Sequence, residues 1–256
     1  MALWSDCKQS SSDAYLSYKK ALAYAKMQGI SFADKSNELT TKPYILAIED
    51  GRIVENDLSR INEFKNDGVK IITLCWSGTN SIGGGWDTTD GLSDFGVDFV
   101  KRCFECGITP DVSHCSVKTT NQAIELAYEH NKTIIASHSN SFSVCNHMRN
   151  LRDEEFLSIS KLGGIVGISL APQHLASSGN ADIKSILNHI DHYLSLGGEN
   201  TVSLGCDFDG VSALPWGIND ISDLSKLHKE ISYNYGNKIT KRIFYNNAFD
   251  FFMKWM

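Results

Sequence analysis

Four residues that can bind metals or carry protons stand at the ends of apolar, β-type runs. Glu49 ends "YILAIE", His114 ends "ITPDVSH", His138 ends "TIIASH", and Asp207 follows "TVSLGC". Neutral imidazoles and carboxylates are ligands that suit Zn²⁺ or a similar divalent ion. Such an ion activates water as a nucleophile, and a nearby Asp can pass the water's proton to a leaving group. The four residues therefore predict a metal site with hydrolytic chemistry.

Each of these residues also has a structural interpretation. A histidine at a strand end, such as His138, is often a hydrogen-bonded core residue, and a carboxylate such as Glu49 often pairs with a neighbouring Lys or Arg. The coincidence of several such residues at strand ends favours a shared metal site over independent structural roles.

A second metal-type pattern, H-x-D in "NHIDHY" (188–193), lies in a stretch of helical periodicity. Residues i and i+2 of a helix point about 200° apart, so His189 and Asp191 are poorly placed to share one ion. We expect His189 and His192 to be surface or packing residues of this helix. His174 follows a β-type run and could reach the predicted site.

Apolar β-type runs alternate with amphipathic stretches along the chain. The runs are 44–49, 69–76, 108–114, 133–138, 164–170 and 201–209, and the amphipathic stretches are 57–68, 94–107, 119–131, 153–164, 181–198 and 239–256. Near-continuous apolar strands between helices predict a parallel sheet covered by helices. No repeat, linker or change of composition divides the chain, so we expect one domain over residues 1–256.

The position of the polar residues separates two α/β architectures that both fit this alternation. In a (β/α)8 barrel the C-terminal strand ends meet at one mouth, where catalytic residues lie. A doubly wound enzyme would carry a Gly-rich phosphate loop after its first strand. The glycine run "SIGGGWDTTDG" (81–91) follows a later strand and lacks the GxGxxG spacing. We therefore predict an α/β fold of the (β/α)8 TIM-barrel type, with 81–91 as an active-site loop.

The composition argues against several classes of protein. The net charge is −6 and no long block of Lys and Arg occurs, so we expect no nucleic-acid partner. No run approaches the roughly 18 apolar residues of a membrane helix, and the N-terminus lacks the pattern of a signal peptide. The odd number of cysteines, 7, predicts reduced thiols and a cytoplasmic location. The lone CxxC, Cys103 to Cys106, lies in an amphipathic stretch and predicts packing thiols.

The sequence resembles the membrane (renal-type) dipeptidase family, peptidase family M19. The matching motifs follow one another in order along nearly the whole chain: "AIEDG", "ITLCWSGTN", "GLSDFG", "DVSHCS", "IIASHSNSFSVCNHMRNL", "GGIVGISLAP", "NHIDH" and "LGCDFDGV". The resemblance implies a (β/α)8 barrel whose two-zinc site activates water to cleave dipeptides. A homodimer is implied by the resemblance alone.

The resemblance also implies roles for individual residues. Glu49 falls where the family has a glutamate that bridges two zinc ions, and His114 and His138 fall on two further zinc ligands. Arg149 matches the arginine that binds the terminal carboxylate of the substrate, a task that suits a planar bidentate donor. Asp207 matches the aspartate that acts as acid and base.

The chain departs from the family pattern in two places. The family's first strand carries an H-x-D pair that binds the other zinc, and residues 1–40 contain no such pair. The run "ALWSDC" resembles the family's second strand, so we expect an incomplete barrel with seven countable strands. Three retained ligands can hold one metal with water in the fourth position, so we expect one zinc ion or two. Trp76 replaces a histidine that contacts substrate in some members and is expected to line the pocket as an aromatic wall.

Three functions follow from these observations. The first is a zinc-dependent dipeptidase that binds a small dipeptide as its substrate. The second is a truncated, weakly active or inactive barrel that acts as a small-ligand or protein-binding module, as the missing H-x-D pair suggests. The third is another barrel metallohydrolase acting on a substrate with a carboxylate, which Arg149 would bind.

Overall fold

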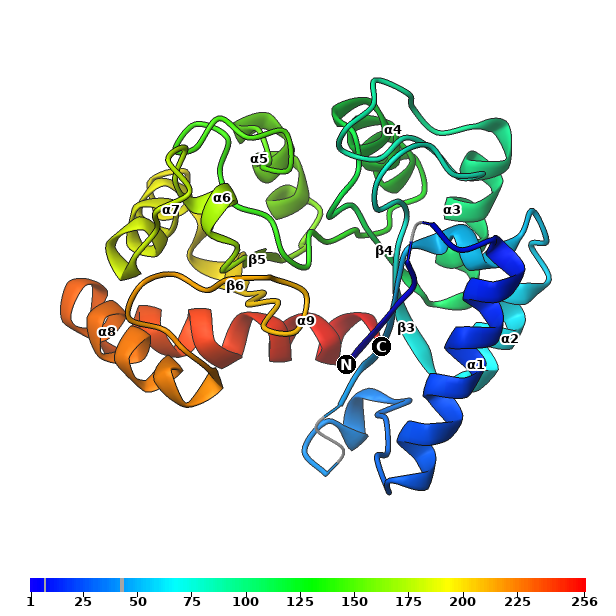
Figure 1. Ribbon diagram of the computed structural model, residues 1–256, viewed down its shortest axis with the longest axis horizontal. Coiled ribbons are helices and arrows are strands. Elements are labelled where there is room, and N and C mark those ends of the chain that lie inside the picture. The colour runs from blue at the N-terminus through cyan, green and yellow to red at the C-terminus, as the bar shows by residue number, and fades with distance from the viewer. Residues whose placement is uncertain (7, 42–43) are drawn as a thin grey trace. The chain divides into compact units, whose positions relative to one another are not determined.

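The computed structural model describes residues 1–6, 8–41 and 44–256. Two compact units make up the chain, and we treat each by itself. The first unit comprises Met1–Ile135 and Phe252–Met256, and the second unit comprises Ala136–Phe251 (Figure 1). A single domain over the whole chain stays a prediction.

The first unit is built on a parallel sheet of four strands in sequence order. The strands are β1 (Ala2–Trp4), β2 (Leu46–Glu49), β3 (Val69–Thr73) and β4 (Thr109–Asp111). Its helices are α1 (Ser11–Met27), α2 (Arg60–Asp67), α3 (Asp94–Cys106) and α4 (Val117–Glu129), with 3-10 turns η1 (Ser36–Glu38) and η2 (Gly51–Val54). Helix α1 packs on β1, α2 on β3 and α3 on β4 (Figure 1). The predicted alternation of parallel strands and covering helices is present in this unit.

The strand register of the first unit sets the carboxyl ends of its strands level with one another. Trp4 pairs with Glu49, Glu49 with Thr73, and Thr73 with Asp111. Side chains just beyond these residues therefore lie at the same edge of the sheet, because parallel strands have their carboxyl ends at one edge.

The second unit contains two parallel strands, β5 (Val166–Ile168) and β6 (Val202–Leu204). Its helices are α5 (Asp153–Lys161), α6 (Pro172–Leu175), α7 (Ile183–Ser195) and α8 (Leu224–Lys241), followed by a π-helical turn η5 (Arg242–Asn246) and α9 (Asn247–Trp255). Two 3-10 turns, η3 (Gly198–Asn200) and η4 (Ile221–Asp223), complete it. The last residues of α9 belong to the first unit.

The predicted strand 133–138 forms single bridges instead of a continuous ladder. Ile135 pairs with Asp111 of β4, and the next residue, Ala136, pairs with Val166 of β5. Several other strands are also shorter than predicted, because polar residues near their ends form turns. At the end of β4, for example, the Ser113 amide donates to Asp111 Oδ1 (2.9 Å) and His114 takes a positive φ of 67°.

Helix α1 and the start of α8 were absent from the predicted elements. Helix α1 begins after Ser10, whose hydroxyl accepts from the Asp13 amide (3.1 Å), and it buries Ala14, Tyr18, Leu22 and Ala25. This serine cap and four-residue spacing are visible in the sequence. Helix α8 contains a non-helical residue, Gly236 (φ 76°), which divides its periodic pattern.

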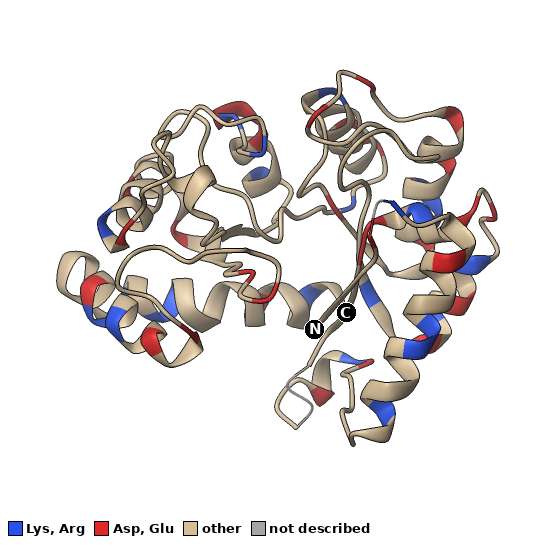
Figure 2. Cartoon of the chain, viewed as in Figure 1, with Lys and Arg blue, Asp and Glu red and all other residues tan. Residues whose placement is uncertain are grey.

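The described cysteines are reduced, as the sequence predicted. The six described cysteines are free thiols, and Cys7, which ends the expected strand "ALWSDC", lies outside the described residues. Cys103 and Cys106 are buried on α3. Acidic and basic residues are interspersed along the helices (Figure 2). Within the described part of the chain, no helix combines the length and apolar character needed to cross a membrane.

Candidate functional site

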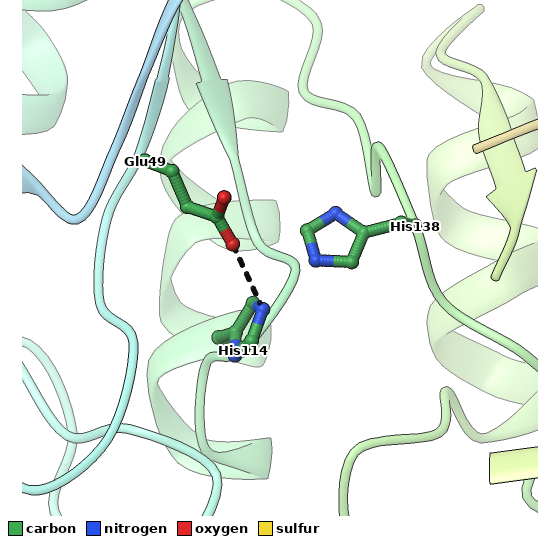
Figure 3. A group of neighbouring side chains, drawn as sticks. All are labelled: Glu49, His114 and His138. Carbon is green, nitrogen blue, oxygen red and sulfur yellow. Dashed lines mark ion pairs between the residues drawn. The ribbon is translucent and has the colours of Figure 1, made fainter. Parts of the chain in front are cut away.

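Glu49 and His114 meet at the carboxyl edge of the first unit's sheet. Glu49 is the last residue of β2, and His114 follows the end of β4. The Nε2 atom of His114 lies 3.1 Å from Glu49 Oε1, and His114 is buried (Figure 3). The positive φ of His114, 67°, is a costly conformation for a residue with a side chain, and such residues cluster at functional sites.

His138 completes a set of three side chains that can bind a metal. One ligand atom from each of Glu49, His114 and His138 lies within 4.8 Å of the others (Figure 3). Ser137 Oγ lies 2.8 Å from His138 Nδ1, so Nε2 is the ring nitrogen that would bind an ion. Ligands at about 2.1 Å from a tetrahedral Zn²⁺ stand about 3.4 Å apart. The Glu49–His114 spacing is close to that value, so the donor set fits a zinc ion after small adjustments.

A glycine-rich loop holds His114 in place. The Trp86 amide donates to His114 O (2.7 Å), and the Ser116 amide donates to Gly84 O (2.9 Å). A Cβ at Gly85 would stand 2.8 Å from Gly78 O and 2.9 Å from Trp76 O, so the loop can take this path only with glycine there. The stretch 81–91, predicted as an active-site loop, thus lies against the backbone of a candidate metal ligand.

Asp50 and Asn80 connect this loop to the strand that carries Glu49, and neither was among the site residues predicted from the sequence. Asp50 is fully buried, and its Oδ1 accepts from Asn80 Nδ2 (3.0 Å) and from the Arg52 amide (3.1 Å). Asn80 Oδ1 in turn accepts from the amides of Ile82 (2.8 Å) and Gly83 (3.0 Å). Asp50 lies in the motif "AIEDG" and Asn80 in the motif "ITLCWSGTN", and these motifs could have identified them. Burial raises the pKa of Asp50, opposed by Arg52.

Trp76 lies against His114, and a second tryptophan lies against Trp76. The ring centroids of Trp76 and His114 are 5.4 Å apart, with the rings 27° from parallel. Trp4 meets Trp76 edge-on at 5.7 Å. Trp4 belongs to the run "ALWSDC" and was not among the site residues predicted from the sequence.

In the second unit, Arg149 lies against the backbone of His138. Its Nη2 donates to His138 O (3.3 Å), and the side chain is buried. Asp207 is partly buried, and it has a positive φ of 66°. Burial raises the pKa of Asp207, the positive charge of Arg149 opposes that rise, and Asp209 adds to it.

Two glycines allow the strands of the second unit to approach the segment that carries His138. A Cβ at Gly167 or at Gly205 would stand 2.0 Å from Ser137 O. The Ser139 amide donates to Gly167 O (2.7 Å), and the Gly205 amide donates to Ile168 O (3.0 Å). The backbone next to His138 is therefore fixed by close packing of neighbouring strands.

The remaining predicted histidines take different positions. His189 is completely buried and serves packing, with Nδ1 accepting from the Ser141 amide (3.0 Å) and Nε2 3.1 Å from Leu175 O. His192 lies 2.8 Å from Asp153 Oδ1 near the surface. The ring of His174 lies 4.6 Å from that of His147 at a tilt of 52°, and burial, helped by the charge of Arg149, lowers the pKa of His174 to about 3. Neither His189 nor His192 shares an ion-binding group with Asp191 among the described residues.

Comparisons of the sequence identify related proteins. The family model described as membrane dipeptidase (peptidase family M19) matches residues 12–254. An uncharacterised protein of the pqqA 5' region of Klebsiella pneumoniae is 31% identical over 65% of this chain and 65% of its own length. Dipeptidase 3 of Mus musculus is 27% identical over 82% of this chain. The chain spans 65% of the first of these relatives and 43% of the second.

Solved structures share the fold. A metallopeptidase of family M19, dipeptidase AC, superimposes with a TM-score of 0.92 at 21% identity, over 100% of this chain and 84% of that chain. A metallopeptidase from Rhodobacter sphaeroides, liganded with a phosphinate mimic of L-Ala-D-Ala, gives a TM-score of 0.88 at 23% identity, over 99% and 77% of the two chains. The chain therefore has the α/β fold of these structures, and the family match over residues 12–254 shows that it belongs to the membrane dipeptidase family, peptidase family M19.

Proposed function

We propose that this chain is a zinc-dependent dipeptidase. The observation that carries the proposal is the convergence of Glu49, His114 and His138, whose ligand atoms lie within 4.8 Å of one another. Membership of a metallodipeptidase family supports the same chemistry. Two imidazoles and one carboxylate form the three-ligand set that catalytic zinc sites use, with a fourth position open for water.

Each site residue has a separate task in this proposal. Glu49, His114 and His138 hold the ion, which when bound supplies a Lewis acid and lowers the pKa of water. Asp207 accepts the proton of the attacking water and returns it to the leaving amine, and its raised pKa suits both steps. Arg149 binds the free carboxylate of the dipeptide through its planar guanidinium. Trp76 forms an aromatic wall beside His114.

Metal-dependent hydrolysis of dipeptides tests the proposal. The protein is stripped with a chelator, and Zn²⁺ binding and the hydrolysis of Ala-Ala are measured as the metal is returned. We expect binding and turnover in the wild type, and loss of both in the double variant Glu49→Ala/His138→Ala. His192→Ala, on the surface of α7, is the matched control and should keep both. No turnover, together with unchanged metal binding in the double variant, would disprove the proposal.

We also propose that the fold is of the (β/α)8 TIM-barrel type. Parallel strands in sequence order support this in the first unit, and β5 and β6 support it in the second. A crystal structure of the zinc-loaded protein would test the closure of the barrel and the metal stoichiometry. A homodimer and a cytoplasmic location stay predictions, which sedimentation and cell fractionation would test.

A further inference from the structure

Two tryptophans form a continuous aromatic surface that ends on a candidate metal ligand. Trp4 is the register partner of Glu49 in the sheet. Its ring meets Trp76 at 5.7 Å and 62°, and Trp76 lies over His114 at 5.4 Å and 27°. Because His114 Nε2 is 3.1 Å from Glu49 Oε1, the four side chains form one cluster within the first unit.

This aromatic pair is not part of the core. Trp4 is 50% exposed, whereas its neighbour Leu3 is 8% exposed. Trp76 is partly exposed, whereas the preceding Leu74 and Cys75 are fully buried. The strands thus place aliphatic side chains and a thiol in the core and leave two indoles at the edge where Glu49 and His114 emerge. Exposed aromatic surface beside a polar site commonly marks a place where a ligand binds.

We propose that Trp4 and Trp76 form a subsite for an aromatic or large apolar side chain of the substrate, carried by a residue next to the scissile bond. The inference rests on the proposed dipeptidase function and names the class of dipeptide. An indole pair in edge-to-face contact offers a further aromatic ring both a face and an edge, which are the two arrangements that aromatic side chains prefer.

The position of the pair supports this occupant. Trp76 lies directly against His114, so a group that packs on Trp76 lies next to one of the candidate metal ligands. The charged groups around Glu49, notably Asp50 and Arg52, are bonded to each other. The indoles therefore offer the apolar part of this edge, where a carboxylate side chain would lose hydration without gaining a partner.

A substrate panel tests the inference. The specificity constants kcat/KM of the zinc-loaded protein are measured for Ala-Ala, Phe-Ala and Ala-Phe. We expect at least one phenylalanine dipeptide to exceed Ala-Ala by about tenfold, which corresponds to about 1.4 kcal/mol and lies within the range of aromatic pairs. Trp4→Ala and Trp76→Leu should each reduce that ratio severalfold. Trp216→Ala removes an indole that is 84% exposed in the second unit and should leave the ratio unchanged.

The outcomes separate this inference from the proposed function. If no dipeptide is hydrolysed, the proposed function fails, and the inference is then judged by calorimetric binding of the reduced-amide analogue of Phe-Ala. Binding tighter than that of the Ala-Ala analogue, and weakened by Trp4→Ala, supports the subsite. Equal values for all three dipeptides, or a preference unaffected by both tryptophan variants, overturns it. If the indoles contact only the ammonium group of the substrate, the two tryptophan variants would leave the preference unchanged, because every dipeptide carries this group.

Discussion

The two units hold their candidate metal ligands by different means. In the first unit, side-chain hydrogen bonds run from Asp50, next to Glu49, through Asn80 into the loop that braces His114. In the second unit, the backbone beside His138 is set by strands that pack closely because Gly167 and Gly205 lack a Cβ. A hydrogen-bonded network tolerates small shifts of its members, whereas close-packed backbone does not. Enlarging Gly205 in the second unit should therefore cost more stability than removing the hydrogen bonds of Asn80 in the first.

The largest effect is expected for Gly205→Ala. The new Cβ would stand 2.0 Å from Ser137 O and 2.9 Å from the Cα of His138, so the strands must separate. We expect a loss of about 3–5 kcal/mol in the free energy of unfolding, measured by urea denaturation. Gly179→Ala is the matched control, because it has a positive φ of 73° and no atom within 4 Å, so it adds backbone strain alone. Equal losses for the two variants would contradict the close-packing explanation.

A pH-dependent loss of stability is expected from His189 in the second unit. Burial lowers its pKa to about 4 in the folded protein, below the usual 6.5 of the unfolded chain. The unfolded chain therefore binds more protons between these values, and stability falls as the pH drops through this window. The full loss is about 3 kcal/mol, since one pKa unit corresponds to about 1.4 kcal/mol.

Urea denaturation between pH 7.5 and 4.5 measures this dependence. His189→Asn keeps an acceptor for the Ser141 amide but removes the titrating ring, so it should reduce the slope in this window, while His174, whose pKa burial lowers to about 3, keeps its own contribution. A variant that keeps the full wild-type slope would show that other groups cause the dependence.

A smaller effect is expected for Asn80→Ala in the first unit. The change removes a donor to the buried Asp50 carboxylate and the acceptor of the Ile82 and Gly83 amides. We expect a loss of about 2 kcal/mol in stability. Zn²⁺ affinity should fall about tenfold, because groups behind the ligands orient them. Asn219→Ala breaks an exposed hydrogen bond to Asp223 and should change neither quantity appreciably.

The smallest effect is expected for Asp153→Asn. Asp153 Oδ1 accepts from Ser143 Oγ (3.0 Å) and lies 2.8 Å from His192 Nε2, but the two paired side chains are 31% and 24% exposed. Solvent screening limits such pairs to less than about 1 kcal/mol. Thermal unfolding at low and high salt measures the difference, and a loss as large as that of Asn80→Ala would contradict the screening of this pair by solvent.

The metal-binding residues of the candidate site could be found in the sequence because each of them stands at the end of an apolar, β-type run. Glu49, His114 and His138 each end an apolar run, and the structure brings their ligand atoms together. Asp50, Asn80 and Trp4 were harder to assign, because their roles depend on contacts with residues far away in the chain. Helix α1, by contrast, carried a visible serine cap and spacing.

By itself, the sequence determined the alternation of strands and helices, the family, and the side chains that can bind a metal. It did so because apolar periodicity and residue chemistry are local properties. Only the tertiary structure decided that His114 leaves its strand with a positive φ and that Gly205 faces Ser137. The tertiary structure also decided that Trp4 and Trp76 share one surface. Those features depend on close approaches between segments that are far apart in the sequence. Strand register brings these segments together only when the chain folds.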